Sequence, residues 1–220
     1  MENLLWAAIS LVILLFSAVV HEIAHGWVAY RLGDPTAYYQ GRLTLNPIKH
    51  IDPFMTIILP VALLLFSNGR FAFGGAKPVP INPYNFRHPD KGLMLSSLAG
   101  PLSNILLAVL GTGFFFLFAV IIKHTHLNNP QLMFFFMQVI VLIIIINMML
   151  AVFNLVPIPP LDGSRIMRYF LPWDMKESLD RLEPFGFIII MLLLSSGAFV
   201  FLDIVQIQVA NFLELILTIV

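Results

Sequence analysis

Residues 3–30 read NLLWAAISLVILLFSAVVHEIAHGWVAY, an apolar run that leads into the motif HEIAH. The part of this run before His21 carries no charged side chain. A membrane-spanning helix needs about 20 predominantly apolar residues, so the stretch predicts a span with ionisable groups near its end. Such groups are costly inside a membrane helix and mark functional sites by default. The segment therefore indicates both the fold class and the place to look for chemistry.

The motif at 21–25 has the HExxH pattern. Two histidines four residues apart project from one face of a helix, so His21 and His25 can bind the same zinc ion. Glu22 lies between them and can take a proton from a zinc-bound water. An isolated HExxH also arises by chance in soluble helices. Its position beside an apolar span is what favours a zinc site here.

The composition excludes several classes of protein. The chain is 59% hydrophobic and 11% charged, whereas soluble domains have roughly 25% charged residues. Its net charge is zero, so nothing indicates a nucleic-acid partner. Cysteine is absent, so His and carboxylate side chains must hold any metal. No basic residue precedes the first apolar run, which is not expected to be a cleaved signal peptide.

We predict an all-α polytopic membrane protein with about four to six transmembrane helices. Further spans are expected at 92–122, 131–153 and 185–202. Residues 54–66 are too few for a span and suggest a re-entrant or interfacial piece. Residues 204–220 carry a polar stripe and form either a short last span or an amphipathic surface helix. The expected organisation is one domain over 1–220, with a catalytic core at about 1–172 and C-terminal membrane helices at about 185–220.

The basic residues predict an orientation. If 54–66 does not cross, eleven of the 12 Lys and Arg residues lie on one side and only Lys123 on the other. The positive-inside rule assigns the basic side to the cytoplasm. We therefore expect a multi-pass protein of the cell (cytoplasmic) membrane. The first and third spans then both end at the cytoplasmic side, so the HExxH motif faces the segment that follows Phe153.

That segment, residues 154–163, reads NLVPIPPLDG. Prolines at 157, 159 and 160 cannot continue a helix. Such backbone is tolerated at membrane depth only when it is buried in protein or lines a wet cavity. An open catalytic zinc site needs three protein ligands, and Asp162 is the obvious third. Alternatively, Asp162 caps a turn or helix, and Asn154 caps the end of its own helix.

Three motifs in this order resemble those of the site-2 protease family of intramembrane zinc metalloproteases. They are HEIAH on a membrane helix, LAGPLSN at 98–104 and NLVPIPPLDG at 154–163. The flanking sequences GWVAYRLGD at 26–34 and GGAKPVPINP at 74–83 are also similar to this family. The resemblance is to the compact bacterial and archaeal branch without PDZ or CBS domains.

The resemblance implies one zinc ion held by His21, His25 and Asp162. It implies that Glu22 is the general base in the attack of a zinc-bound water on a peptide bond near the cytoplasmic face. Asn154 is then a catalytic polar group that orients the substrate or stabilises the oxyanion. The implied partners are a transmembrane or membrane-associated protein substrate and the lipid bilayer, with the oligomeric state left open.

The resemblance also implies a small re-entrant, β-hairpin-like element over 71–86 that receives an unwound substrate strand. It makes Asn104 a candidate for substrate contact, although buried amides also bridge membrane helices. The alternative function is a zinc or proton transporter that uses the same His and carboxylate cluster. Against it, the charged groups cluster at one side and no inverted repeat is apparent. A catalytically silent scaffold would not need an intact HExxH and Asp162.

Overall fold

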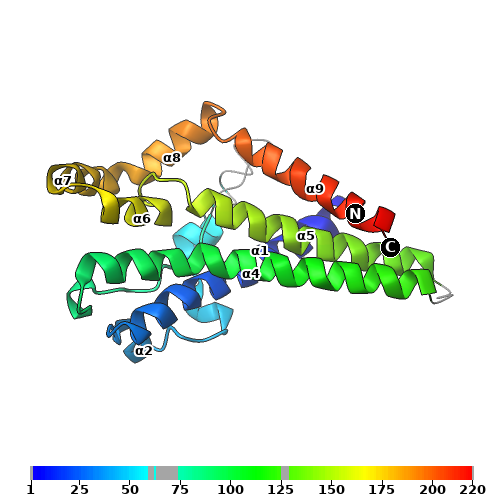
Figure 1. The fold of residues 1–220 in the computed structure, drawn as a ribbon, viewed down its shortest axis with the longest axis horizontal. Coiled ribbons are helices and arrows are strands. Elements are labelled where there is room, and N and C mark those ends of the chain that lie inside the picture. The colour runs from blue at the N-terminus through cyan, green and yellow to red at the C-terminus, as the bar shows by residue number, and fades with distance from the viewer. Residues whose placement is uncertain (1, 59–61, 63–73, 125–128, 220) are drawn as a thin grey trace.

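The computed structural model describes residues 2–58, 62, 74–124 and 129–219. Every regular element within these residues is helical (Figure 1). Four helices are long and apolar enough to cross a membrane. They are α1 (Glu2–Arg31), α4 (Pro89–His124), α5 (Pro130–Asn154) and α9 (Phe201–Ile219). The prediction of an all-α, multi-pass architecture is confirmed at this level.

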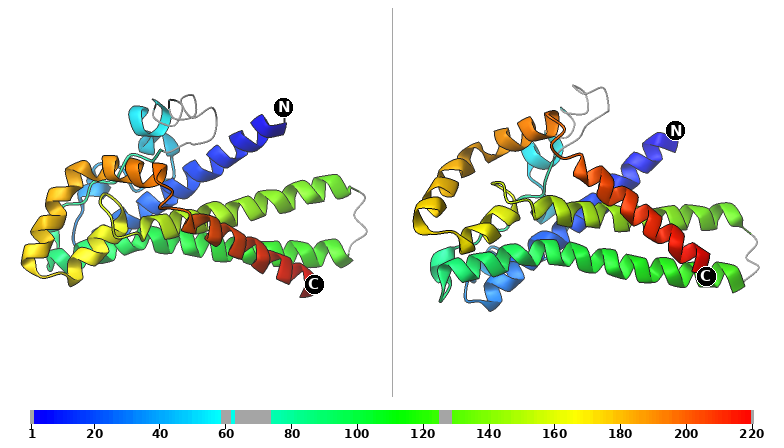
Figure 2. Two further views of the ribbon diagram at one scale, coloured as in Figure 1. Left: turned by 90° about the horizontal axis from the view of Figure 1, so that it is seen from above. Right: turned by 45° about the horizontal axis from the view of Figure 1, so that its top comes forward.

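Helices α1, α4 and α5 form the centre of the fold. α4 and α5 run side by side along the long axis of the molecule, and α1 crosses them obliquely (Figures 1 and 2). Small residues of α4 allow the helices to approach closely, as is common between membrane helices. A Cβ at Gly111 would lie 2.9 Å from Ile144 of α5, so glycine is needed at that contact.

The shorter elements complete the chain. Near one end of the long helices, which we call the site end, lie α2, α6 and α7, and the opposite end is the distal end (Figure 1). The bounds are α2 Thr36–Tyr39, η1 Pro47–His50, η2 Pro53–Ile58, η3 Pro83–Asn85, α6 Asp162–Phe170, α7 Trp173–Leu182, η4 Glu183–Phe185 and α8 Gly186–Ser195.

The connection from α1 to α4 begins and returns at the site end. Arg31 and Leu32 at the end of α1 share a small pocket with Lys91 at the start of α4. The end of α1 and the start of α4 therefore lie at the same end of the long helices; whether 54–66 crosses the membrane stays a prediction. Part of that segment forms η2, and most of the rest lies outside the described residues. α1 and α5 both end at the site end, as predicted.

The span predicted at 185–202 is wrong. α8 ends at Ser195, and Gly197 adopts a φ of 77°. The N–H of Ala198 donates to Leu193 O, and that of Gly197 donates to Leu194 O. These bonds form a Schellman motif, which ends a helix at a left-handed glycine. The last candidate span is instead α9, which includes most of the ambiguous segment 204–220.

The predicted β-hairpin over 71–86 is not confirmed. Residues 71–73 lie outside the described residues, 74–82 are irregular and 83–85 form the helical turn η3. Pro78 and Pro80 have no N–H to donate to a strand ladder. Lys77 instead donates its N–H to His50 O and accepts from Arg42 through its carbonyl. The segment 74–82 is therefore held by separate contacts, without a strand ladder in its described part.

Candidate metal centre and active site

Two histidines on α1 form the first part of the site. His21 and His25 lie one helical turn apart and are buried, with their Nε2 atoms 2.9 Å from each other. α4 packs directly against them at Gly100. A Cβ at this position would lie 2.4 Å from the His25 ring, so only glycine permits the contact. The AGP sequence of α4 therefore forms one wall of the site.

Asp162, the first residue of α6, brings a carboxylate to both imidazoles. Its Oδ2 lies 3.1 Å from Nε2 of His21 and 3.2 Å from Nε2 of His25. Gly163 makes this position possible, because a Cβ there would lie 2.2 Å from Leu155 O. The proline-rich turn can therefore fold back on itself and present Asp162 to α1.

The three donor atoms fit a zinc ion. Tetrahedral zinc with Zn–N bonds of about 2.0–2.1 Å separates its ligand atoms by roughly 3.3 Å, close to the observed spacing. Oδ2 of Asp162 is buried and makes no hydrogen bond that meets normal geometry. A buried carboxylate oxygen without a hydrogen-bond donor needs another partner, and a cation shared with the two imidazoles would satisfy it.

The other ring nitrogen of each histidine is anchored. Nδ1 of His21 donates to Oδ1 of Asn104 at 2.6 Å, and Nδ1 of His25 donates to Ser96 O at 2.7 Å. With the proton on Nδ1, the lone pair of each Nε2 is free to bind a metal. Metal-ligating histidines almost always have such a partner, which sets the tautomer and the ring orientation. Asn104 is thus an orienting group for His21.

Two residues that the sequence analysis missed extend this anchor. Nδ2 of Asn104 donates to Oδ1 of Asn147 at 2.9 Å, and Nδ2 of Asn147 donates to Oγ of Ser17 at 3.0 Å. All three side chains are buried. The sequence does contain a signal, because Asn147 is a single amide in the apolar run IIIINMML and Ser17 precedes His21 by one helical turn. This series of side-chain hydrogen bonds links α1, α4 and α5 beside the metal site.

Glu22 contacts the irregular segment 74–82. Its Oε2 accepts a 2.7 Å hydrogen bond from the backbone N–H of Val79. Asn154, the last residue of α5, donates through Nδ2 to Leu150 O of its own helix at 2.9 Å. This is the bond that the capping alternative predicts. The catalytic role of Asn154 stays a prediction.

Asp34 forms hydrogen bonds with the C-terminal end of segment 74–82. Its carboxylate accepts hydrogen bonds of 2.7 Å from the Asn82 N–H and from Nδ2 of Asn85. It also accepts from the N–H and the hydroxyl of Thr36. Burial raises the pKa of Asp34, but these hydrogen bonds outweigh it and lower the pKa below its ordinary value. The turn after α1 is thereby tied to the segment that contacts Glu22.

Comparisons with known proteins identify the family. The sequence profile described as Peptidase family M50 matches residues 9–196. The "Putative zinc metalloprotease YwhC" of Bacillus subtilis (strain 168) is 38% identical over 200 residues, which cover 88% of this chain and 85% of the relative. The "Putative zinc metalloprotease Rip2" of Mycolicibacterium smegmatis is 32% identical over 184 residues, covering 84% of this chain and 65% of the relative. No solved structure matches the chain.

The matched range contains every residue of the metal cluster and of its anchors. The family match and the converging His21, His25 and Asp162 donors support the same chemistry. The chain therefore belongs to peptidase family M50, the site-2 proteases, and is a zinc metalloprotease.

Proposed function

We propose that the protein is an intramembrane endopeptidase that hydrolyses peptide bonds of transmembrane or membrane-associated proteins. The observation that carries this proposal is the convergence of two Nε2 atoms and one buried carboxylate oxygen at the end of apolar helices. His21, His25 and Asp162 would hold one zinc ion. When bound, zinc would supply Lewis-acid activation of a water molecule and of the scissile carbonyl.

Glu22 acts as general base in this proposal. Its carboxylate takes a proton from the attacking water and delivers it to the leaving amine. The Val79 N–H holds one carboxylate oxygen, which limits the orientations that the base can adopt. Asn154 exchanges its bond to Leu150 O for one to the developing oxyanion or to the substrate backbone.

A substrate helix must unwind before attack because its carbonyl groups are engaged in internal hydrogen bonds. The freed backbone groups then need new partners, since unpaired polar groups are costly in a membrane. We place the unwound strand against segment 74–82, which already contacts Glu22 through Val79. Pairing with this backbone would offset part of the cost of unwinding.

The proposed site opens toward the cytoplasm. Lys123 lies in the last turn of α4, at the distal end. Seven basic residues belong to α6, α7 or the pocket between the end of α1 and the start of α4, all at the site end: Arg31, Arg87, Lys91, Arg165, Arg168, Lys176 and Arg181. The positive-inside rule then supports a cytoplasmic site end in the cell membrane. The transporter alternative is not supported, because the family is one of peptidases and the described residues contain one such cluster, not a relay of them.

Metal analysis and a cleavage assay test the proposal together. Detergent-purified protein should carry close to one zinc per chain, and Asp162→Ala should lose most of it. Glu22→Gln should keep the zinc and lose cleavage of a transmembrane substrate by about 10²-fold or more. Zinc content that is indifferent to Asp162, or full cleavage by Glu22→Gln, would contradict the assigned roles.

A further inference from the structure

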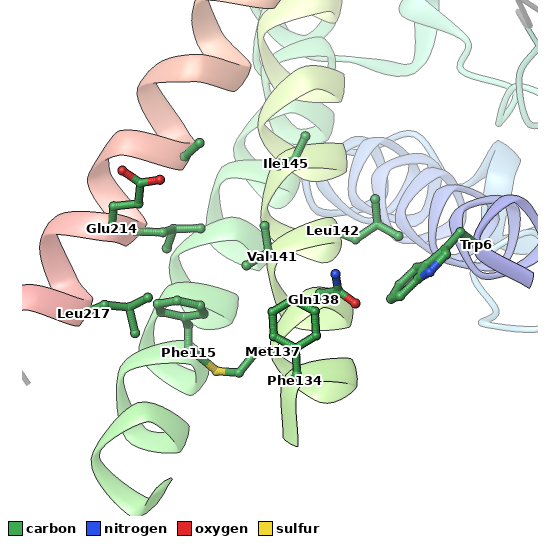
Figure 3. A pocket seen from close by; sticks show the side chains of 12 residues that line it. Trp6, Phe115, Phe134, Met137, Gln138, Val141, Leu142, Ile145, Glu214 and Leu217 are labelled. Atoms are coloured by element: carbon green, nitrogen blue, oxygen red, sulfur yellow. The ribbon is translucent and has the colours of Figure 1, made fainter. Parts of the chain in front are cut away.

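A groove lies in the distal half of the molecule, between α1, α4, α5 and α9 (Figure 3). It has a volume of about 600 Å³ and is lined almost entirely by apolar side chains. Trp6 of α1, Phe134 and Leu142 of α5, and Leu217 of α9 contribute to its walls. Pockets of this size hold drug-sized ligands, so the groove accommodates the side chains along one face of a helix and not a whole helix.

Two polar side chains interrupt this apolar lining. Figure 3 shows Gln138 on α5 and Glu214 on α9 among the apolar side chains. Within the described residues, neither the amide nor the carboxylate has a hydrogen-bond or ion-pair partner. Both residues are exposed at the groove. The groove therefore presents two unpaired acceptor groups in otherwise apolar surroundings.

The depth of these groups makes the lack of a partner costly. Gln138 lies about two helical turns, or roughly 12 Å, from Pro130 at the distal end of α5. Phe115 lines the same groove and packs in one buried cluster with Leu213, the neighbour of Glu214 in α9; it lies a similar distance from Lys123 near the distal end of α4. α5 has 25 residues and is about 37 Å long, whereas a hydrocarbon core is about 30 Å thick, so Gln138 falls inside the core when α5 spans the membrane. Glu214 lines the same groove as Gln138. A carboxylate at this depth is expected to have a specific partner.

We propose that this groove docks one transmembrane helix whose apolar face carries a hydrogen-bond donor, such as a lysine side chain, opposite Glu214 and Gln138. Under the proposed function, on which this inference rests, that helix belongs to the protein substrate. Chemical complementarity favours this occupant. Acyl chains would fill the apolar part of the groove but would leave both polar side chains unpaired, whereas a donor on a helix satisfies them.

The groove and the metal site share two helices. α1 carries Trp6 in the groove and His21 in the site, about 22 Å apart along the helix axis. α5 lines the groove and ends at Asn154, just before the turn that carries Asp162. A helix docked in the groove therefore extends toward the metal site. Its distal half stays folded and is recognised, while its other half is the part that unwinds for cleavage.

Photo-crosslinking in lipid nanodiscs tests this proposal. Because the chain has no cysteine, a benzophenone can be attached at Phe134→Cys on the groove rim in full-length Glu22→Gln protein. The matched label site is Val109→Cys on α4, which is similarly exposed but lies outside the groove. The probes are two synthetic Leu/Ala transmembrane peptides. One carries a single lysine about 12 Å from its distal end, and the other has leucine at that position.

The lysine peptide should crosslink to the groove label about threefold to tenfold more than the leucine peptide, as expected for one interhelical hydrogen bond. Glu214→Leu should abolish this preference, and Glu214→Gln should keep part of it. Asn211→Leu is the matched control, because it removes an exposed polar group of α9 that does not line the groove. The Val109 label should capture both peptides equally and weakly. Zinc content measured on each variant confirms that its fold is intact.

Equal capture of the two peptides at Phe134, or capture unchanged by Glu214→Leu, would overturn the proposal in favour of a groove filled by lipid. Crosslinked dimers that depend on Glu214 would overturn it in favour of a second copy of this chain. The readout needs no cleavage, so its failure is distinguishable from that of the proposed function. Lost selectivity with normal zinc content and cleavage refutes the groove alone. If the labelled Glu22→Gln protein captures the lysine peptide selectively, but the wild-type protein binds zinc and cleaves no substrate, the protease proposal alone is refuted.

Discussion

The backbone N–H of Val79 donates a 2.7 Å hydrogen bond to Oε2 of Glu22. This bond joins the HExxH helix to a proline-rich segment far away in the sequence. Val79 itself is buried, and its side chain packs near Gly26 one helical turn after Glu22. The position of the proposed general base therefore depends on a segment that carries no metal ligand.

Replacing Val79 with proline removes this donor. A general base contributes about 10²–10⁴-fold to the rate. Without the Val79 hydrogen bond, Glu22 should lose part of this contribution, and the kcat of the variant should fall roughly tenfold. Zinc content should not change, because no metal ligand is touched. Val79→Ala is the control, since it keeps the N–H while shortening the side chain. Equal cleavage by the proline and alanine variants would show that the hydrogen bond does not orient Glu22.

Gly100→Ala should disrupt the metal site. The new Cβ would lie 2.4 Å from the His25 ring and 2.6 Å from the His21 ring, so at least one imidazole must move. We expect zinc stoichiometry to fall to less than half, measured by metal analysis of purified protein. The matched change is Gly113→Ala on the same helix, where a Cβ meets nothing within 4 Å. Full zinc content in Gly100→Ala would mean that α4 does not pack against the histidines in this way.

The buried amides should influence zinc affinity although they do not touch the metal. Changing a group that anchors a metal-ligating histidine typically costs 10- to 100-fold in affinity. We expect Asn104→Leu to weaken zinc binding by at least about tenfold and Asn147→Leu to weaken it less. Competition with a chelating dye measures this affinity.

The control for these amides is Thr112→Val, because the Thr112 hydroxyl bonds only to Ala108 O of its own helix. An Asn104→Leu protein with the zinc affinity of Thr112→Val would contradict the anchoring role. Rescue of zinc binding by Asn104→Gln or Asn104→Asp would support it, because both restore an acceptor for Nδ1 of His21.

Asp34→Ala should lower stability by about 1.5–3 kcal/mol, because it removes the buried carboxylate that accepts hydrogen bonds from Thr36, Asn82 and Asn85. The pKa of Asp34 is lowered in the folded protein, so the stabilising contribution of this carboxylate is complete above its ordinary pKa. The contribution disappears as the pH falls through the lower folded pKa. Thermal unfolding in detergent should therefore show a difference from wild type at pH 7 that narrows below about pH 4.

The exposed Asp174 provides the comparison for this effect. Asp174→Ala should change the unfolding temperature little at either pH, because surface substitutions usually act within about 0.5 kcal/mol. A stability difference for Asp34→Ala that stays constant, or grows, as the pH falls from 7 to 3 would contradict the proposed role of its carboxylate.

Hydropathy predicted most of the helices but not where they end. It placed a span at 185–202 because the residues are apolar, yet the helix stops where Gly197 takes a left-handed conformation. Hydropathy indicates which segments enter the membrane but not where a helix ends. The Schellman motif that ends this helix depends on the left-handed backbone conformation of one glycine. For 71–86 the prediction of a hairpin came from resemblance. The prolines of 74–83 oppose a regular strand ladder there.

In the candidate site, too, some residues could be predicted from the sequence and others could not. His21 and His25 could be paired from sequence because a helix places residues four apart on one face, whatever the rest of the chain does. Asp162 could be added because zinc chemistry requires a third ligand. The sequence analysis assigned a catalytic role to Asn154 and only a possible substrate contact to Asn104. In the structure, Asn104 contacts His21, while Asn154 bonds within its own helix. Their roles depend on the direction in which each amide points.

The sequence by itself determined the helical class of the fold, the three candidate metal ligands and the family, since these follow from local periodicity and from short motifs. Only the tertiary structure decided how Ser17, Asn104 and Asn147 join into one buried chain, and how Val79 reaches Glu22. These contacts link residues far apart in the chain. Their geometry follows from how α1, α4 and α5 pack, and close packing between helices is not encoded in any single segment.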